Sequence, residues 1–99
     1  MLSGKNRAFL RSLANGLDTI FQIGKNGVTD ETIKQVAAAL EVRELIKLRV
    51  LETAPLTAKE ASAVLCEKLN AEGVSCIGYR FVLYRESKTI PKDKRISFQ

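Results

Sequence analysis

Helix-type and strand-type segments alternate along the 99-residue chain, and this alternation limits the possible folds more than any other feature of the sequence. Three segments carry apolar residues at helical spacing: residues 4–15, 29–42 and 57–71. Four segments are runs of good strand formers: residues 19–23, 44–51, 74–78 and 80–85. The predicted order of elements is therefore α-β-α-β-α-β-β.

This order places the chain in the α/β class. Strand–helix–strand units favour right-handed crossovers with parallel pairing. The last two strands favour a hairpin, with Gly78 providing a turn or bulge between them. The length allows one domain. We expect an α/β sandwich of two or three layers around a small four-stranded mixed sheet, formed by residues 1–86, and a basic tail, residues 87–99, that is irregular and partly mobile.

Local signals mark where the helices begin and end. The pair Asn15-Gly16 is expected to end the first helix in left-handed backbone conformations. Thr57 and Glu60 have the spacing of a capping box at the start of the third helix. Gly73 is expected to stop that helix.

The composition excludes several classes of function. There is no histidine, and therefore no Ser–His or Cys–His nucleophile pair, no imidazole base and no histidine metal ligand. Cys66 and Cys76 are too few for a structural zinc site and are expected to be small buried apolar residues, without a disulfide. Asp18, Asp30 and Glu31 have no recognisable catalytic spacing. We expect no enzyme activity, no metal and no cofactor.

The sequence also predicts where the protein acts. No apolar run approaches the roughly 20 residues that a membrane-spanning helix needs. Residues 1–11 lack the apolar segment of a signal peptide. We therefore expect a cytoplasmic monomer without a membrane partner.

Basic residues are concentrated at the two ends of the chain. The net charge is +5, but residues 1–28 carry four basic residues against one acidic, and residues 77–99 carry six against two. The intervening segment has six basic and eight acidic residues. If the two ends meet in the fold, they form one basic face that suits nucleic acid. The alternative is that these charges are merely solvated. The candidates that we single out are Lys5, Arg7 and Arg11 of the first helix, and Lys47 and Arg49, which alternate with apolar residues in the second strand.

The loop Gly24-Lys25-Asn26-Gly27 connects a predicted strand to the predicted start of a helix. Glycine permits unusual backbone angles and a close approach by a ligand. The free amides at a helix start suit a phosphate, and Lys25 adds a full positive charge. Gly-x-x-Gly loops of KH-type modules clamp the backbone of single-stranded nucleotides in this way. An ordinary turn is the alternative interpretation.

Aromatic residues contribute little to this prediction. Phe9, Phe21 and Phe81 lie in apolar surroundings and are expected in the core, while Tyr79 and Tyr84 remain open. We therefore expect binding to depend on phosphate contacts and shape more than on base stacking.

Several short strings occur together in one order: Leu2-Ser3-Gly4-Lys5, Arg11-Ser12-Leu13-Ala14, Ile23-Gly24-Lys25-Asn26-Gly27, Glu44-Leu45-Ile46-Lys47-Leu48, Ile77-Gly78 and Val82-Leu83-Tyr84-Arg85. As a set they resemble the bacterial YhbY family, the single-domain form of the CRM (chloroplast RNA splicing and ribosome maturation) domain. The resemblance covers residues 2–97. It implies an RNA-binding protein similar in fold to the C-terminal domain of a bacterial translation initiation factor.

The resemblance also implies a site and a partner. The loop of residues 24–27 matches the family loop that belongs to the RNA surface, whereas Lys47 and Arg49 match a basic strand in character only. Bacterial stand-alone members associate with precursors of the large ribosomal subunit. The prediction is a non-catalytic protein that binds ribosomal RNA during ribosome assembly. The alternative is an adaptor that uses the same basic face to bind an acidic protein.

Overall fold

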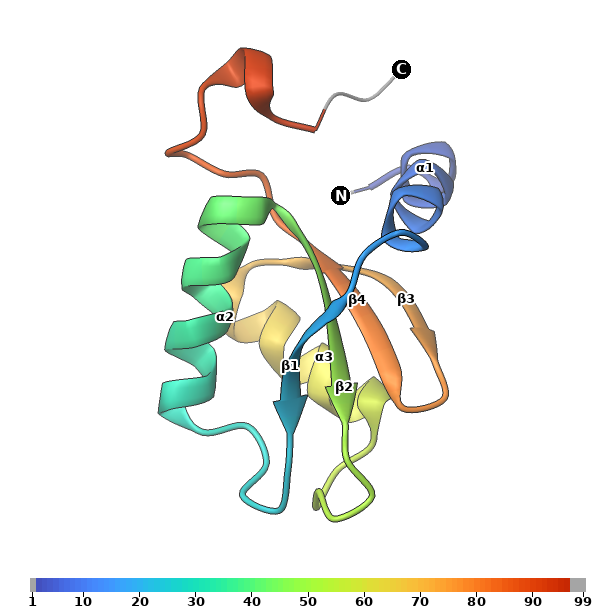
Figure 1. Ribbon diagram of the computed structural model, residues 1–99, viewed down its shortest axis with the longest axis vertical. Coiled ribbons are helices and arrows are strands. Elements are labelled where there is room, and N and C mark those ends of the chain that lie inside the picture. The colour runs from blue at the N-terminus through green and yellow to red at the C-terminus, as the bar shows by residue number, and fades with distance from the viewer. Residues whose placement is uncertain (1, 97–99) are drawn as a thin grey trace.

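The computed structural model describes residues 2–96 (Figure 1). Its elements are α1 (Gly4–Ala14), β1 (Thr19–Ile23), α2 (Asp30–Arg43), β2 (Leu45–Val50), α3 (Ala58–Leu69), β3 (Glu72–Ile77), β4 (Arg80–Tyr84) and a short 3₁₀ helix (Lys92–Lys94). The predicted α-β-α-β-α-β-β order is confirmed. Residues 1 and 97–99, which we had assigned to the ends of the domain and of the tail, lie outside the described part of the chain.

The four strands form one mixed sheet in the order β1-β2-β4-β3. β1 runs parallel to β2, and β4 runs antiparallel to both β2 and β3. β1, β2 and β3 therefore point the same way and end at one edge of the sheet. The loops that follow these three strands lie together at the lower end of the molecule in Figure 1.

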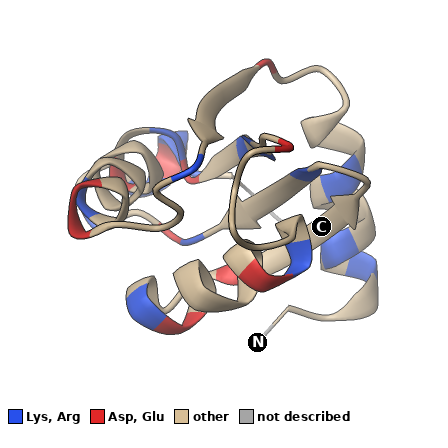
Figure 2. Ribbon diagram, turned by 90° about the horizontal axis from the view of Figure 1, so that it is seen from below, with Lys and Arg blue, Asp and Glu red and all other residues tan. Residues whose placement is uncertain are grey.

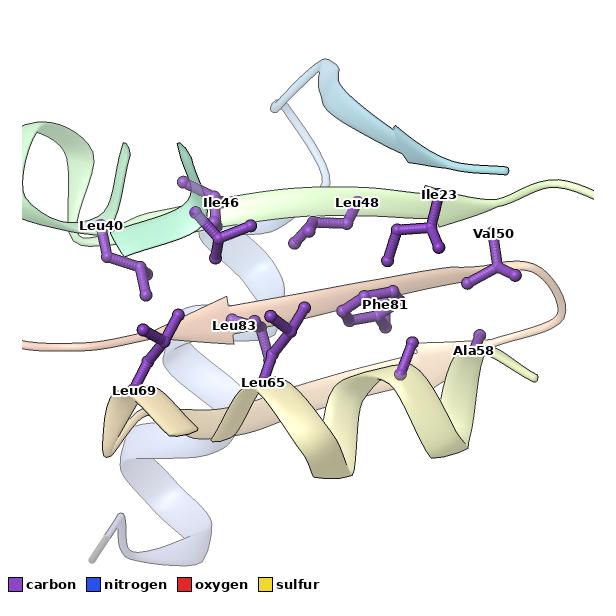
Figure 3. Close-up of a cluster of buried hydrophobic side chains, with 12 residues drawn as sticks. Ile23, Leu40, Ile46, Leu48, Val50, Ala58, Leu65, Leu69, Phe81 and Leu83 are labelled. Atoms are coloured by element: carbon purple, nitrogen blue, oxygen red, sulfur yellow. The ribbon is translucent and has the colours of Figure 1, made fainter. Parts of the chain in front are cut away.

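The main core lies between one face of the sheet and the helices α2 and α3. Ile46, Leu48 and Val50 alternate along β2 and are all buried in this core, as is Phe81 of β4. Figure 3 shows Leu65 of α3 among these side chains. The period of two expected for β2 is thus confirmed, and it directs the residues between them to the opposite face.

The opposite face is covered at one end only, by α1. A second, smaller core joins this helix to the sheet through Leu10, Ala14, Leu45, Val74, Val82 and Tyr84. The molecule consequently has three layers where α1 packs and two layers elsewhere. None of the helices within residues 2–96 is long and apolar enough to cross a membrane.

The helix ends agree with the sequence in part. Thr57 and Glu60 form the predicted capping box, with the Glu60 amide donating to Thr57 Oγ1 at 3.1 Å and the Thr57 amide to Glu60 Oε1 at 2.9 Å. Asn15 follows α1 but keeps a right-handed φ of −58°, so the predicted left-handed ending is wrong. α3 ends at Asn70, which has φ +54°, and not at Gly73, which lies in β3. Asparagine tolerates this left-handed conformation and ends the helix three residues early.

The two cysteines are free, but they are not both buried as the sequence suggested. Cys66 on α3 is half-buried and Cys76 on β3 is exposed. β3 is an edge strand with a neighbour on one side only, which leaves residues near its end open to solvent.

Residues 87–96 are attached to the domain. The Ser87 amide donates to Glu44 Oε2 and the Ile96 amide to Glu44 Oε1, both at 2.8 Å. Arg95 pairs with Glu86 at 2.9 Å. Apart from the 3₁₀ helix this segment has no regular structure. The partial mobility expected from the sequence stays a prediction.

Candidate nucleic-acid interface

The part of the sheet that α1 leaves uncovered carries positive charge. Lys47 and Arg49 of β2 lie on this face, as the alternation predicted, and both are partly exposed. Arg80 of β4 is the register partner of Arg49 and is exposed beside it. We call these three residues together with Arg11 of α1 the open basic face. Arg80 was missed from the sequence because its place beside Arg49 depends on the strand order.

Arg49 and Arg80 form a like-charge pair across two neighbouring strands. Like charges directly opposite each other destabilise a sheet. Neither guanidinium forms an ion pair with any carboxylate within residues 2–96. Such a pair favours an anion from outside the chain, since a phosphate can accept from both guanidinium groups at once.

A shallow groove of about 220 Å³ brings three of these cations together between α1 and the sheet. Arg11, Lys47 and Arg80 line it, along with the polar side chains of Asn15 and Ser75. One cation from each basic end of the chain, Arg11 and Arg80, therefore lies in this groove.

The other two cations predicted on α1 lie elsewhere. Arg7 Nε donates to the carbonyl of Gly73 at 3.1 Å, and its guanidinium lies 4.0 Å from the Glu72 carboxylate. These contacts fasten α1 to β3, so Arg7 has a structural role although it shares a helix face with Arg11. Lys5 is exposed near the start of α1 and does not line the groove.

The glycine loop is a tight turn at the end of β1. The Gly27 amide donates to the Gly24 carbonyl at 2.9 Å, and Lys25 and Asn26 are exposed at the tip. Gly27 has φ +67°, and a Cβ atom there would lie 3.2 Å from Pro55 Cγ. Both the backbone conformation and the packing therefore favour glycine at position 27. Gly24 has no such φ, and a Cβ atom there would make only an ordinary contact with Leu51.

The start of α2 is separate from the glycine loop. The helix begins three residues after the loop, and the Thr29 hydroxyl accepts from the Thr32 amide at 3.2 Å. Asp30 and Glu31 occupy the first turn, where their charges offset the helix dipole. An anion at the loop would be bound by Lys25 and the amides of the turn itself.

The loop and the open basic face adjoin at the edge where β1, β2 and β3 end. The Leu51 amide donates to the Ile23 carbonyl at 2.9 Å, and the Val50 amide donates to the Tyr79 carbonyl at 2.7 Å. These bonds place the loops after β1, β2 and β3 side by side. Figure 2 looks onto this edge from below. Within residues 2–96 no group of three or more Cys, Asp or Glu side chains is arranged to hold a metal ion.

The chain is similar to several known proteins. Residues 2–85 match the CRS1/YhbY (CRM) domain. A Bacillus subtilis protein named "Probable RNA-binding protein YqeI" is 48% identical over 88 residues, which are 89% of this chain and 92% of that protein. A Haemophilus influenzae protein named "RNA-binding protein" is 33% identical over 87 residues, 88% of each chain.

A solved structure supports the same assignment. The solution structure of a hypothetical protein from Staphylococcus aureus, considered to bind RNA, matches with a TM-score of 0.77 and 47% identity. The match covers 93% of this chain and 96% of that one. Fold, family model and relatives agree with the resemblance seen in the sequence, and the chain belongs to the CRS1/YhbY (CRM) domain family.

Proposed function

We propose that this protein is a non-catalytic, cytoplasmic monomer that binds RNA through the loop of residues 24–27 and the open basic face. The observation that carries the proposal is the Arg49–Arg80 pair, which has no acidic partner within residues 2–96 and adjoins the loop. The names of the two bacterial relatives, both RNA-binding proteins, support the choice of RNA as the anion.

Binding would consist of holding the RNA backbone. Lys25 and the amides of the turn would contact one phosphate at the sheet edge. Arg49 and Arg80 would bind the next phosphates with their planar guanidinium groups, which can donate two parallel hydrogen bonds to one phosphate. Lys47 and Arg11 would continue this path along the groove beside α1. No step requires an acid, a base or a metal.

Salt dependence tests the binding surface. The logarithm of affinity for a single-stranded RNA falls with the logarithm of salt concentration, with a slope of about −0.7 per phosphate contacted. The double substitution Arg49→Gln, Arg80→Gln is expected to weaken binding to every RNA sequence and to reduce the slope by about 1 to 1.5. The matched control, Lys59→Gln with Lys68→Gln, removes two charges from exposed positions of α3. Equal affinities and slopes for the two variants would contradict the proposed surface.

The loop is tested separately by replacing Lys25 and Asn26 with alanine. Both side chains are exposed, so this variant is expected to fold. It should bind RNA more weakly, with a slope reduced by about 0.7. An unchanged affinity would show that the loop does not contribute to RNA binding and would leave the open basic face as the site.

We further propose that the RNA is ribosomal RNA in precursors of the large subunit. This rests on the resemblance to stand-alone family members. Crosslinking in cells, followed by sequencing of the attached RNA, should yield precursor large-subunit RNA. Attached RNA that is mainly messenger or transfer RNA would contradict it. If a pull-down retained its protein partners after ribonuclease treatment, the alternative of an adaptor for an acidic protein would be favoured.

A further inference from the structure

A second groove opens at the edge of the sheet where β1, β2 and β3 end, beside the start of α3. It has a volume of about 450 Å³ and lies between the β2–α3 loop and the β3–β4 turn. Leu51, Ala54, Pro55 and Leu56 provide apolar lining, and Tyr79 lies across from them. The size is within the range typical of small-ligand sites.

Tyr79 is the aromatic residue best placed to meet a ligand in this groove. Its side chain is 53% exposed, whereas Phe81 and Tyr84 are buried. Its backbone is nevertheless held, because its carbonyl accepts from the Val50 amide and because it follows Gly78, which turns the chain with φ +61°. A fixed and exposed aromatic ring stacks with nucleobases at low entropic cost, since its backbone is already ordered.

The groove shares a wall with the glycine loop. Gly27 packs against Pro55 and Leu56, the same two residues that line the groove. Arg80 follows Tyr79 directly, but it lines the groove beside α1, whereas Tyr79 lines the groove beside the start of α3, so the two side chains lie on opposite faces of the sheet. An RNA strand that passes from the open basic face over the loop of residues 24–27 would bring a base within reach of Tyr79.

The charge at the rim of this groove differs from that of the basic face. Glu52 lines it and is exposed, and its carboxylate repels a phosphate. A carboxylate accepts hydrogen bonds from the amino groups of bases. The two surfaces are thus complementary to different parts of an RNA strand, with cations for the phosphates and an apolar, acid-rimmed groove for a base.

We propose that this groove binds an unpaired nucleobase of the RNA, stacked on Tyr79, so that the protein selects single-stranded over duplex RNA. The inference rests on the proposed RNA binding and names the form of RNA that is bound. It adds a base contact to the expectation from the sequence that binding depends on phosphate contacts and shape more than on base stacking, because the exposure of Tyr79 could not be known before the fold.

The test uses a single-stranded RNA of eight nucleotides carrying 2-aminopurine, a base whose fluorescence is quenched by stacking, and the same RNA annealed to its complement. Tyr79→Leu is expected to weaken binding of the single strand about 5- to 100-fold and to reduce quenching. It should leave the salt slope unchanged because no phosphate contact is lost. Tyr79→Phe keeps the ring and should bind like the wild type.

Controls separate the two proposals. Val42→Ala, at an exposed apolar position of α2, should leave binding and quenching unchanged. The duplex should bind more weakly than the single strand and be indifferent to Tyr79→Leu. If Tyr79→Leu binds and quenches like the wild type while the Arg49, Arg80 double variant still loses affinity, base binding is overturned and RNA binding stands. If the wild type binds neither RNA, both proposals are overturned.

Discussion

At the scale of single residues, Glu44 connects three parts of the fold. It ends α2 with its amide donating to the Leu40 carbonyl at 2.8 Å, and its side chain is 1% exposed. Its backbone has φ +64°, a conformation that costs a non-glycine residue about 1–3 kcal/mol. The strain persists because both carboxylate oxygens accept amides from the segment after β4.

Replacing Glu44 by alanine should therefore destabilise the protein by about 2–5 kcal/mol, because two amides lose their partner. Urea unfolding measures this change. Glu44→Gln should have an intermediate effect, since only one of its two terminal atoms can accept. Glu67→Ala on the exposed face of α3 is the control, and an equal effect of the Glu44 and Glu67 substitutions would contradict the role of Glu44.

Alanine substitutions at the two loop glycines are expected to differ in their effect on stability, measured by the same urea unfolding. Gly27→Ala forces a Cβ atom into a left-handed backbone conformation and to within 3.2 Å of Pro55 Cγ, so it should cost about 1–2 kcal/mol. Gly24→Ala meets neither obstacle and should be close to neutral. Equal losses of stability at the two positions would show that Gly27 does not have the left-handed conformation described.

At the scale of elements, α2 and the segment after β4 meet at Glu41. Its carboxylate accepts from the Lys88 amide at 2.8 Å and lies 3.4 Å from the Arg85 guanidinium. The Lys88 amide, followed by the charge of Arg85, holds the pKa of Glu41 below its ordinary value of 4.5. The contact between Glu41 and the segment after β4 is therefore stronger while Glu41 is ionised.

This linkage predicts a dependence of stability on pH. A carboxyl group whose pKa is lowered by folding contributes stability above its unfolded pKa and loses that contribution as the pH falls through the lower folded value. Wild-type protein should thus lose more stability than Glu41→Gln on going from pH 6 to pH 3, measured by urea midpoints. Glu67→Gln should follow the wild type, and parallel curves for wild type and Glu41→Gln would contradict the linkage.

The elements themselves were the most predictable part of the fold. Alternation in β2, the capping box at Thr57 and the turn at Gly78 depend on residues that are close in sequence, and all three were confirmed. The same alternation correctly directed Lys47 and Arg49 away from the main core. The left-handed ending predicted for α1 and the stop at Gly73 predicted for α3 were wrong, because left-handed angles are available to several residue types near a helix end.

At the scale of the whole molecule, the sequence could not show contacts between residues that lie far apart along the chain. Arg7 and Arg11 are equivalent in a helix pattern, and only the position of β3 reveals that Arg7 is bound to Gly73 and Glu72. Arg80 joins the candidate site only because β4 lies beside β2 in the sheet. A sequence alone fixes neither strand order nor register, so it could not show which basic residues lie together in the fold.

The unequal exposure of the two cysteines has a practical consequence for labelling. Burial raises the pKa of the Cys66 thiol, which leaves less of the reactive thiolate near neutral pH, whereas Cys76 is open to solvent. At pH 7 a maleimide dye should attach first at Cys76, as mass spectrometry of tryptic peptides would show, and Cys76→Ser should slow the reaction. Predominant labelling of Cys66 would contradict this. A dye at Cys76, two residues before the turn at Gly78, would report on RNA at the sheet edge without any engineered cysteine.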